Sequence, residues 1–136
     1  MDTPMVLMYN LNNDKGSRLR LVCLKLHIRV RSVRAEEYAQ PVGALAGLCP
    51  PVSGAPEAPG FEDEMLVLVN FDGALLNRFL GQIRASRTPG VALKAVLTPT
   101  NMLWSSAQLH DEIRREHEAM RYGASAHPSA DEPSKS

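Results

Sequence analysis

Glu64-Met-Leu-Val-Leu-Val-Asn70 is a short apolar run that ends in an amide side chain, and it predicts a strand covered on both faces. Met5-Val-Leu-Met-Tyr9 is a second run of the same kind. A strand with two apolar faces belongs at the centre of a sheet. Apolar residues at helical spacing follow each run, over residues 19–26 and 75–83. Each central strand is therefore expected to lead into a helix that packs on the sheet.

Two further strands complete the expected sheet. Ile28-Arg-Val-Arg-Ser-Val33 alternates apolar and polar residues, as an edge strand with one wet face does, and residues 92–97 form the fourth strand. The alternation of strands and helices predicts an α/β domain with a mainly parallel sheet in the strand order 2-1-3-4. The alternative is a ferredoxin-like α+β sandwich with an extra C-terminal helix. The long segment between the second and third strands has room for a crossover, which favours the parallel form.

Length and composition indicate one small domain. The chain has 136 residues, with 15 basic and 15 acidic side chains. We expect a single domain over residues 1–122, with a Pro/Gly loop at residues 50–60 and a disordered tail at residues 123–136. The last helix is expected to end near Tyr122. The balanced charge and scarce aromatic residues argue against a nucleic-acid partner, and no apolar run reaches the length of a membrane span. The start lacks the pattern of a signal peptide, so we expect a cytoplasmic protein.

Polar side chains follow the central strands and the fourth strand. In an open parallel sheet, ligands bind beyond the carboxyl ends of the strands, where the strand order reverses. A ligand site at this edge would use Asn10, Asn12, Asn70, Asp72, Thr98, Thr100 and Asn101. The alternative is that these residues are helix caps and turn residues, among them Asp72 as the cap of the helix that follows it. We find no phosphate-binding loop, metal-ligand spacing or nucleophile pattern, so we expect no cofactor and no metal and assign no catalytic residue.

Lys94 interrupts the apolar pattern of the fourth strand. A lysine ammonium is strongly hydrated, so burial of Lys94 would require a partner. In the last helix, Glu116 projects near the centre of the apolar stripe. We therefore expect either a shielded Lys94–Glu116 ion pair that holds the last helix on the sheet, or an exposed Lys94 at the sheet edge.

Three segments carry a resemblance to a known family. Gln40-Pro-Val-Gly-Ala-Leu-Ala-Gly-Leu48, Gly60-Phe-Glu-Asp-Glu-Met65 and Lys94-Ala-Val-Leu-Thr-Pro-Thr-Asn101 with Trp104 resemble a family of short bacterial proteins that is known as a domain of unknown function. The resemblance covers residues 5–120 without the Pro-rich insert. The family implies no activity and no cofactor. It implies a bacterial, cytoplasmic setting and a shared surface around Lys94, Thr98, Asn101 and Trp104.

The leading functional reading is a non-enzymatic module that binds a small molecule or a protein, in a regulatory role. A second reading is an enzyme in which Lys94, activated by burial, acts as a base or Schiff-base amine. A third is a homodimer that pairs the basic edge strand Ile28–Val33 with its own copy.

Overall fold

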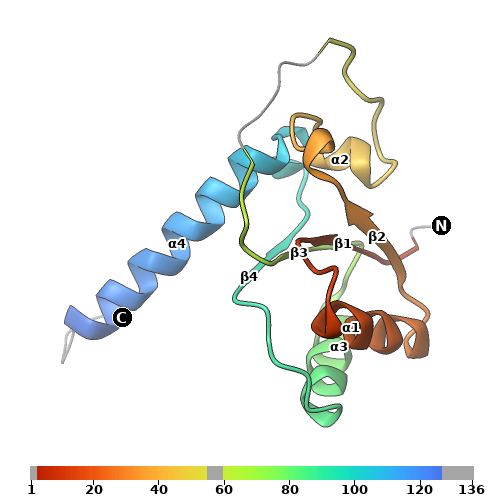
Figure 1. Ribbon diagram of the computed structural model, residues 1–136, viewed down its shortest axis with the longest axis vertical. Coiled ribbons are helices and arrows are strands. Elements are labelled where there is room, and N and C mark those ends of the chain that lie inside the picture. The colour runs from red at the N-terminus through yellow and green to blue at the C-terminus, as the bar shows by residue number, and fades with distance from the viewer. Residues whose placement is uncertain (1–2, 55–59, 127–136) are drawn as a thin grey trace.

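The fold is built on a four-stranded sheet in the order β2-β1-β3-β4 (Figure 1). The computed structural model describes residues 3–54 and 60–126. The strands are β1 (Met5–Tyr9), β2 (Arg29–Val33), β3 (Met65–Val69) and β4 (Leu93–Val96). The helices are α1 (Asp14–Lys25), α2 (Val42–Leu45), α3 (Gly73–Ala85) and α4 (Ser106–Ala126), with short 3-10 turns η1 (Ala35–Glu37) and η2 (Asn101–Leu103). The predicted α/β class and strand order are confirmed.

The directions of the strands determine where their ends lie. β1 is parallel to β2, and β3 is parallel to β4, as the two helical crossovers predict. The central pair, β1 and β3, is antiparallel, with Met5 opposite Val69 and Tyr9 opposite Met65. The ferredoxin-like alternative is not formed, because β2 lies beside β1 and runs parallel to it. The sheet is thus mainly parallel, but its two parallel pairs point in opposite directions.

Side chains of the central strands enter two separate hydrophobic cores. Val6, Met8, Leu66 and Leu68 point to the face covered by α1 and α3. The alternate residues point to the other face, where α2 and α4 contribute Val42, Leu45, Leu109 and Ile113. β1 and β3 are buried at every position, which explains their continuous apolar sequence.

Local capping groups start each long helix. The Asn13 side chain accepts a hydrogen bond from the Gly16 N–H at 2.9 Å, and Asp72 accepts one from the Leu75 N–H at 2.7 Å. Asp72 is therefore the helix cap that the sequence predicted. At α4, Ser105 Oγ accepts from the Gln108 N–H, and the Gln108 side chain accepts from the Ser105 N–H.

The chain contains two halves with the same order of structural elements. We call residues 5–45 the N-half and residues 65–126 the C-half. Each half runs through a strand, a helix, a parallel strand, a 3-10 turn, one isolated bridge residue and a second helix. The bridge residues, Pro41 and Ser105, pair with each other in antiparallel fashion. The antiparallel β1–β3 ladder is centred on Leu7 and Val67, so an approximate two-fold axis passes between these residues.

The C-terminal helix extends away from the sheet (Figure 1). Ile113 is its last residue in the core, and most side chains from Arg114 to Met120 are exposed. α4 continues to Ala126, past the predicted end at Tyr122, and the rest of the predicted tail, residues 127–136, lies outside the described residues. None of the helices in the described part of the chain is long and apolar enough to span a membrane.

Candidate functional site

The sheet separates the seven residues that the sequence grouped into one ligand site. Asn10 and Asn12 follow β1, beside the start of β3, whereas Asn70 and Asp72 follow β3, beside the start of β1. Parallel pairing of β4 with β3 puts Thr98, Thr100 and Asn101 at the Asn70 end. The prediction of one shared edge was wrong because it assumed that β1 and β3 were parallel. Ligand binding by either group stays a prediction.

Several of these residues have local structural partners. The Thr98 N–H donates to Asn101 Oδ1 at 2.8 Å, and the Asn101 N–H donates to Thr98 Oγ1 at 3.0 Å. The Asn101 amide also donates to the Val96 carbonyl, so these groups close the turn after β4. Asn70 adopts φ 61° and donates to the Thr3 carbonyl. These bonds agree with the alternative reading of caps and turns.

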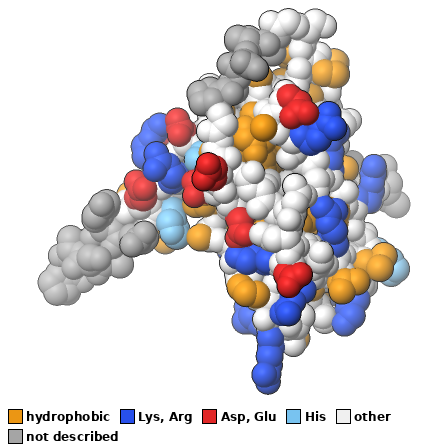
Figure 2. Space-filling model, viewed as in Figure 1, with side chains coloured by type: hydrophobic (Ala, Val, Ile, Leu, Met, Phe, Trp, Pro, Cys, Tyr) orange, Lys and Arg blue, Asp and Glu red, His pale blue; other side chains and the backbone are white. Residues whose placement is uncertain are grey.

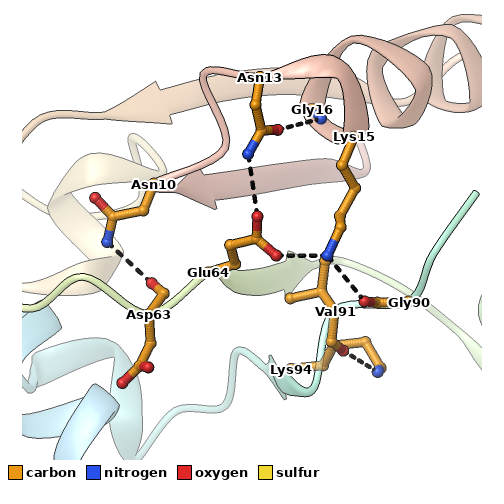
Figure 3. A network of polar contacts seen from close by, with 9 residues as sticks. All are labelled: Asn10, Asn13, Lys15, Gly16, Asp63, Glu64, Gly90, Val91 and Lys94. Atoms are coloured by element: carbon orange, nitrogen blue, oxygen red, sulfur yellow. Dashed lines mark hydrogen bonds and ion pairs between the residues drawn. The ribbon is translucent and has the colours of Figure 1, made fainter.

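Lys94 and Glu116 lie on opposite faces of the sheet. Lys94 alternates with Leu93 and Ala95, which belong to the core beneath α4, so Lys94 points to the α3 face. It is exposed, and its ammonium donates to the Val91 carbonyl (Figure 3). Within the described residues no ion pair joins Lys94 to Glu116. The expected pair is therefore absent, and the exposed alternative for Lys94 is confirmed.

The structure does bring together a polar cluster around Phe61–Glu64, which we call the entry segment because it leads into β3. The Asn10 amide donates to the carbonyls of Phe61 and Asp63, both at 2.9 Å. Glu64 accepts from Lys15 at 2.6 Å and from the Asn13 amide at 3.1 Å (Figure 3). The N-half thus holds the entry segment with two side chains from the β1–α1 turn, Asn10 and Asn13, and one from the first turn of α1, Lys15.

Charge and burial in this cluster act on Glu64. Hydrogen bonding from Lys15 lowers the pKa of the Glu64 carboxyl, an effect that partial burial opposes. Lys15 also donates to the Gly90 carbonyl at 3.3 Å. The sequence pointed to neither Lys15 nor its pairing with Glu64, because the two residues are far apart in the chain.

An aromatic stack fixes the other side of the entry segment. The Phe61 ring lies between the rings of Tyr38 and His110, with centroid distances of 4.5 Å and 3.8 Å. His110 is buried, and its Nε2 lies 2.7 Å from Asp63 Oδ2. His110 is therefore a buried histidine with a hydrogen-bonding partner.

The polar cluster is built as a clamp. Its carboxylates, amides and ammonium groups hydrogen-bond to one another or to backbone carbonyls, which leaves them engaged in holding the entry segment. Among the described residues, no three His, Cys, Asp or Glu side chains are grouped so that they could hold a metal ion. Burial raises the pKa of the Cys23 thiol to about 12, which suits a core residue and not a nucleophile.

A groove lies between α1 and α3. It has a volume of about 520 Å³. Its lining combines apolar side chains with two cations and two small polar side chains: Arg18, Leu21, Val22, Leu24, Lys25, Gln82 and Ser86. Leu21 and Leu24 are 62% and 71% exposed. Figure 2 shows hydrophobic side chains between Lys and Arg side chains over the part of the molecule formed by α1 and α3.

Comparison with known proteins finds a similarity over the C-half. Residues 64–120 match a family described as "Domain of unknown function (DUF3783)". The match begins one residue before β3 and ends within α4, so it covers β3, α3, β4, η2 and most of α4. It includes the Lys94–Trp104 block but not the Gln40–Leu48 segment. No curated protein and no solved structure matches the chain.

Proposed function

We propose that the protein is a non-enzymatic binding module and that a helix of a partner protein docks in the groove between α1 and α3. The observation that carries this proposal is the exposure of two leucines, Leu21 and Leu24, side by side on α1. Exposed apolar side chains that are grouped and rimmed by charge are typical of interaction surfaces.

The C-half supplies an internal control for these leucines. The helix ends Leu26 and Ser86 occupy equivalent positions and are followed by His27 and Arg87, whose φ angles are 59° and 57°. In the resulting alignment, Leu21 corresponds to Gly81, and Leu24 to Arg84.

The core positions of the two helices keep their character in the same alignment. Leu19 and Cys23 correspond to Phe79 and Ile83, and all four are buried. Apolar residues are therefore needed at these core positions, whereas Gly81 shows that the fold does not need a leucine at the position of Leu21. We attribute Leu21 and Leu24 to binding.

The chemistry of the rim defines the partner. Arg18 lies about one turn before Leu21, and Lys25 directly follows Leu24. The two cations therefore place positive charge at both ends of the apolar strip, roughly 10 Å apart at helical rise. Leucine side chains recognise apolar residues on one face of a helix, and the cations favour carboxylates beside them. The proposed ligand is therefore an amphipathic helix whose apolar face is flanked by Asp or Glu.

The enzyme reading receives less support. It required a desolvated Lys94 amine in a pocket, but Lys94 is exposed and hydrogen-bonded to Val91. Neither Lys94 nor the other residues of the predicted ligand site line the groove.

The test is to add designed helical peptides to the full-length protein and to monitor its amide signals by NMR. One peptide carries leucines flanked by glutamates, and a second carries the same leucines flanked by lysines. The acidic peptide should shift the amide signals of α1 and α3 and bind more weakly as salt is added.

Leu24→Ala, which removes most of the exposed apolar side chain and leaves the charge of the groove unchanged, should weaken binding of the acidic peptide by roughly tenfold or more. Leu103→Ala is the matched control, because Leu103 is also exposed, at 68%, but belongs to η2. Shifts that map outside α1 and α3, or equal affinities for Leu24→Ala and the wild type, would contradict the proposal. Tighter binding of the basic peptide would contradict its electrostatic part.

A further inference from the structure

At the interface between the two halves, the backbone N–H donors of the two halves are related by the approximate two-fold axis. The Val42 N–H donates to the Trp104 carbonyl at 2.8 Å, and the Ser106 N–H donates to the Tyr38 carbonyl at 3.1 Å. Val42 and Ser106 are the first residues of α2 and α4, so each half offers the same donor to the other.

The asparagine side chains at the ends of β1 and β3 are related by the same axis. Asn10 and Asn70 are the first residues after β1 and β3, and both adopt left-handed backbone conformations, with φ of 59° and 61°. Each donates from its side-chain amide to a carbonyl two residues before the opposite strand: Asn10 to Asp63, and Asn70 to Thr3. Asparagine tolerates this conformation better than most residues, which gives the repeated residue a physical reason.

We infer that the chain is a fused pair of one structural unit, and that the surface of the C-half along β3 can bind a second copy of the C-half in place of the N-half. The family similarity supports the unit: it covers residues 64–120, which include most of the C-half and none of the N-half. The inference concerns the interface between the halves and is independent of the groove on α1.

The contacts of such a C-half pair follow from the two-fold axis. β3 would pair with its own copy in antiparallel fashion around Val67, the residue that now faces Leu7. Asn70 would reach the Asp63 carbonyl of the other copy, which is the acceptor that Asn10 now uses. The Ser106 N–H would donate to the Trp104 carbonyl of the other copy, which now accepts from Val42.

The reverse pairing, two N-halves, lacks a partner for one buried group. The Tyr9 hydroxyl lies 2.7 Å from Ser106 Oγ, and both residues are fully buried. In an N-half pair, valine would stand at the Ser106 position, so the Tyr9 hydroxyl would lose this bond. A C-half pair would likewise put Val69 at the Tyr9 position, so the buried Ser106 hydroxyl would lose the same bond. A buried hydroxyl without a partner is costly, so the mixed pair should be more stable than either pair of like halves.

The experiment uses the full chain with a protease site in place of residues 55–59, cut after folding so that both halves stay present. The nicked protein is unfolded in urea and refolded, and the masses of the resulting complexes are measured by native mass spectrometry. A species with twice the mass of the C-half should appear beside the mixed pair. Recovery of the mixed pair with the remaining C-half monomeric would overturn the inference.

Cysteine trapping tests the register separately. Both natural cysteines, Cys23 and Cys49, belong to the N-half or the segment after it, so Val67→Cys makes a unique thiol in the C-half. Directly opposed residues of an antiparallel pair are close enough for a disulfide. Refolding of the nicked Val67→Cys protein under oxidation should give disulfide-linked C-half dimers.

Asn77→Cys, on the exposed side of α3, is the matched control and should give few such dimers. Equal cross-linking of the Val67→Cys and Asn77→Cys proteins would contradict the proposed register. So would the absence of cross-linking in the Val67→Cys protein if the Asn77→Cys protein forms C-half dimers by mass.

Discussion

The Tyr9 and Ser106 hydroxyls form a buried hydrogen bond of 2.7 Å that joins β1 of the N-half to the start of α4 in the C-half. Burial raises the pKa of the Tyr9 hydroxyl above its ordinary value, so the group stays protonated and available as a donor. This bond is the clearest polar tie between the halves within the core.

Ser106→Ala should lower the free energy of unfolding by about 1–3 kcal/mol, because it leaves the buried Tyr9 hydroxyl without a partner. Combining it with Tyr9→Phe should cost less than the sum of the single changes, since the double variant removes both polar groups. Urea denaturation of the two single variants and the double variant measures this coupling. Additive effects would show that the bond contributes little.

Glu64→Gln should lower the free energy of unfolding at pH 7 by about 0.5–1 kcal/mol, because Lys15 loses its carboxylate partner. The pKa of Glu64 is lowered in the folded state, so its contribution is complete above the unfolded pKa near 4.5. It is lost as pH falls through the lower folded pKa.

The difference between wild type and Glu64→Gln should therefore shrink as pH falls below about 4.5 and vanish once the carboxyl is protonated in both states. Denaturation curves at a series of pH values test this dependence. Glu62→Gln is the matched control, because Glu62 is exposed and lies two residues before Glu64. A pH-dependent difference of the same size there would assign the effect to overall charge.

Gly16→Ala and Gly81→Ala should change stability in opposite directions. A Cβ at Gly16 would lie 1.7 Å from the Leu11 carbonyl oxygen, so the α1 turn would have to shift, at a cost of about 1–3 kcal/mol or more. A Cβ at Gly81 would lie no closer than 4.0 Å to the Arg84 side chain, and alanine should stabilise α3 by about 0.5–1 kcal/mol. Thermal melts of both variants decide this, and a stable Gly16→Ala would refute the close approach.

Lys94→Met and Glu116→Leu should have additive effects on stability, within about 0.5 kcal/mol, because the two residues lie on opposite faces of the sheet. A double-mutant cycle measured in urea tests this. A coupling energy near the 3–5 kcal/mol expected for a broken buried pair would place the residues in contact after all.

Much of the fold could be read from apolar periodicity. The fully buried strands β1 and β3 have continuous apolar sequences, and the exposed face of β2 carries Arg29 and Arg31. Asp72 was recognised as a cap because capping depends on residues within one turn. The internal repeat was missed, although Met5–Asn10 and Met65–Asn70 share both end residues and an apolar run between them.

The candidate site could not be predicted in the same way. The seven residues were grouped on the assumption of parallel central strands, and a strand buried on both faces shows the same apolar run in either direction. The clamp of Asn10, Asn13 and Lys15 on the entry segment joins residues that lie far apart in the chain.

By itself, the sequence determined the elements, their order in the sheet and the local caps, because these depend on side chains within a few positions of one another. The tertiary structure alone decided the antiparallel meeting of β1 and β3. That single choice separated the expected ligand residues and created the approximate two-fold axis. The long connection between α2 and β3 allows β3 to run in either direction beside β1. In the observed direction, the Asn10 and Asn70 side-chain amides bond to the carbonyls of Asp63 and Thr3, which lie two residues before the opposite strands.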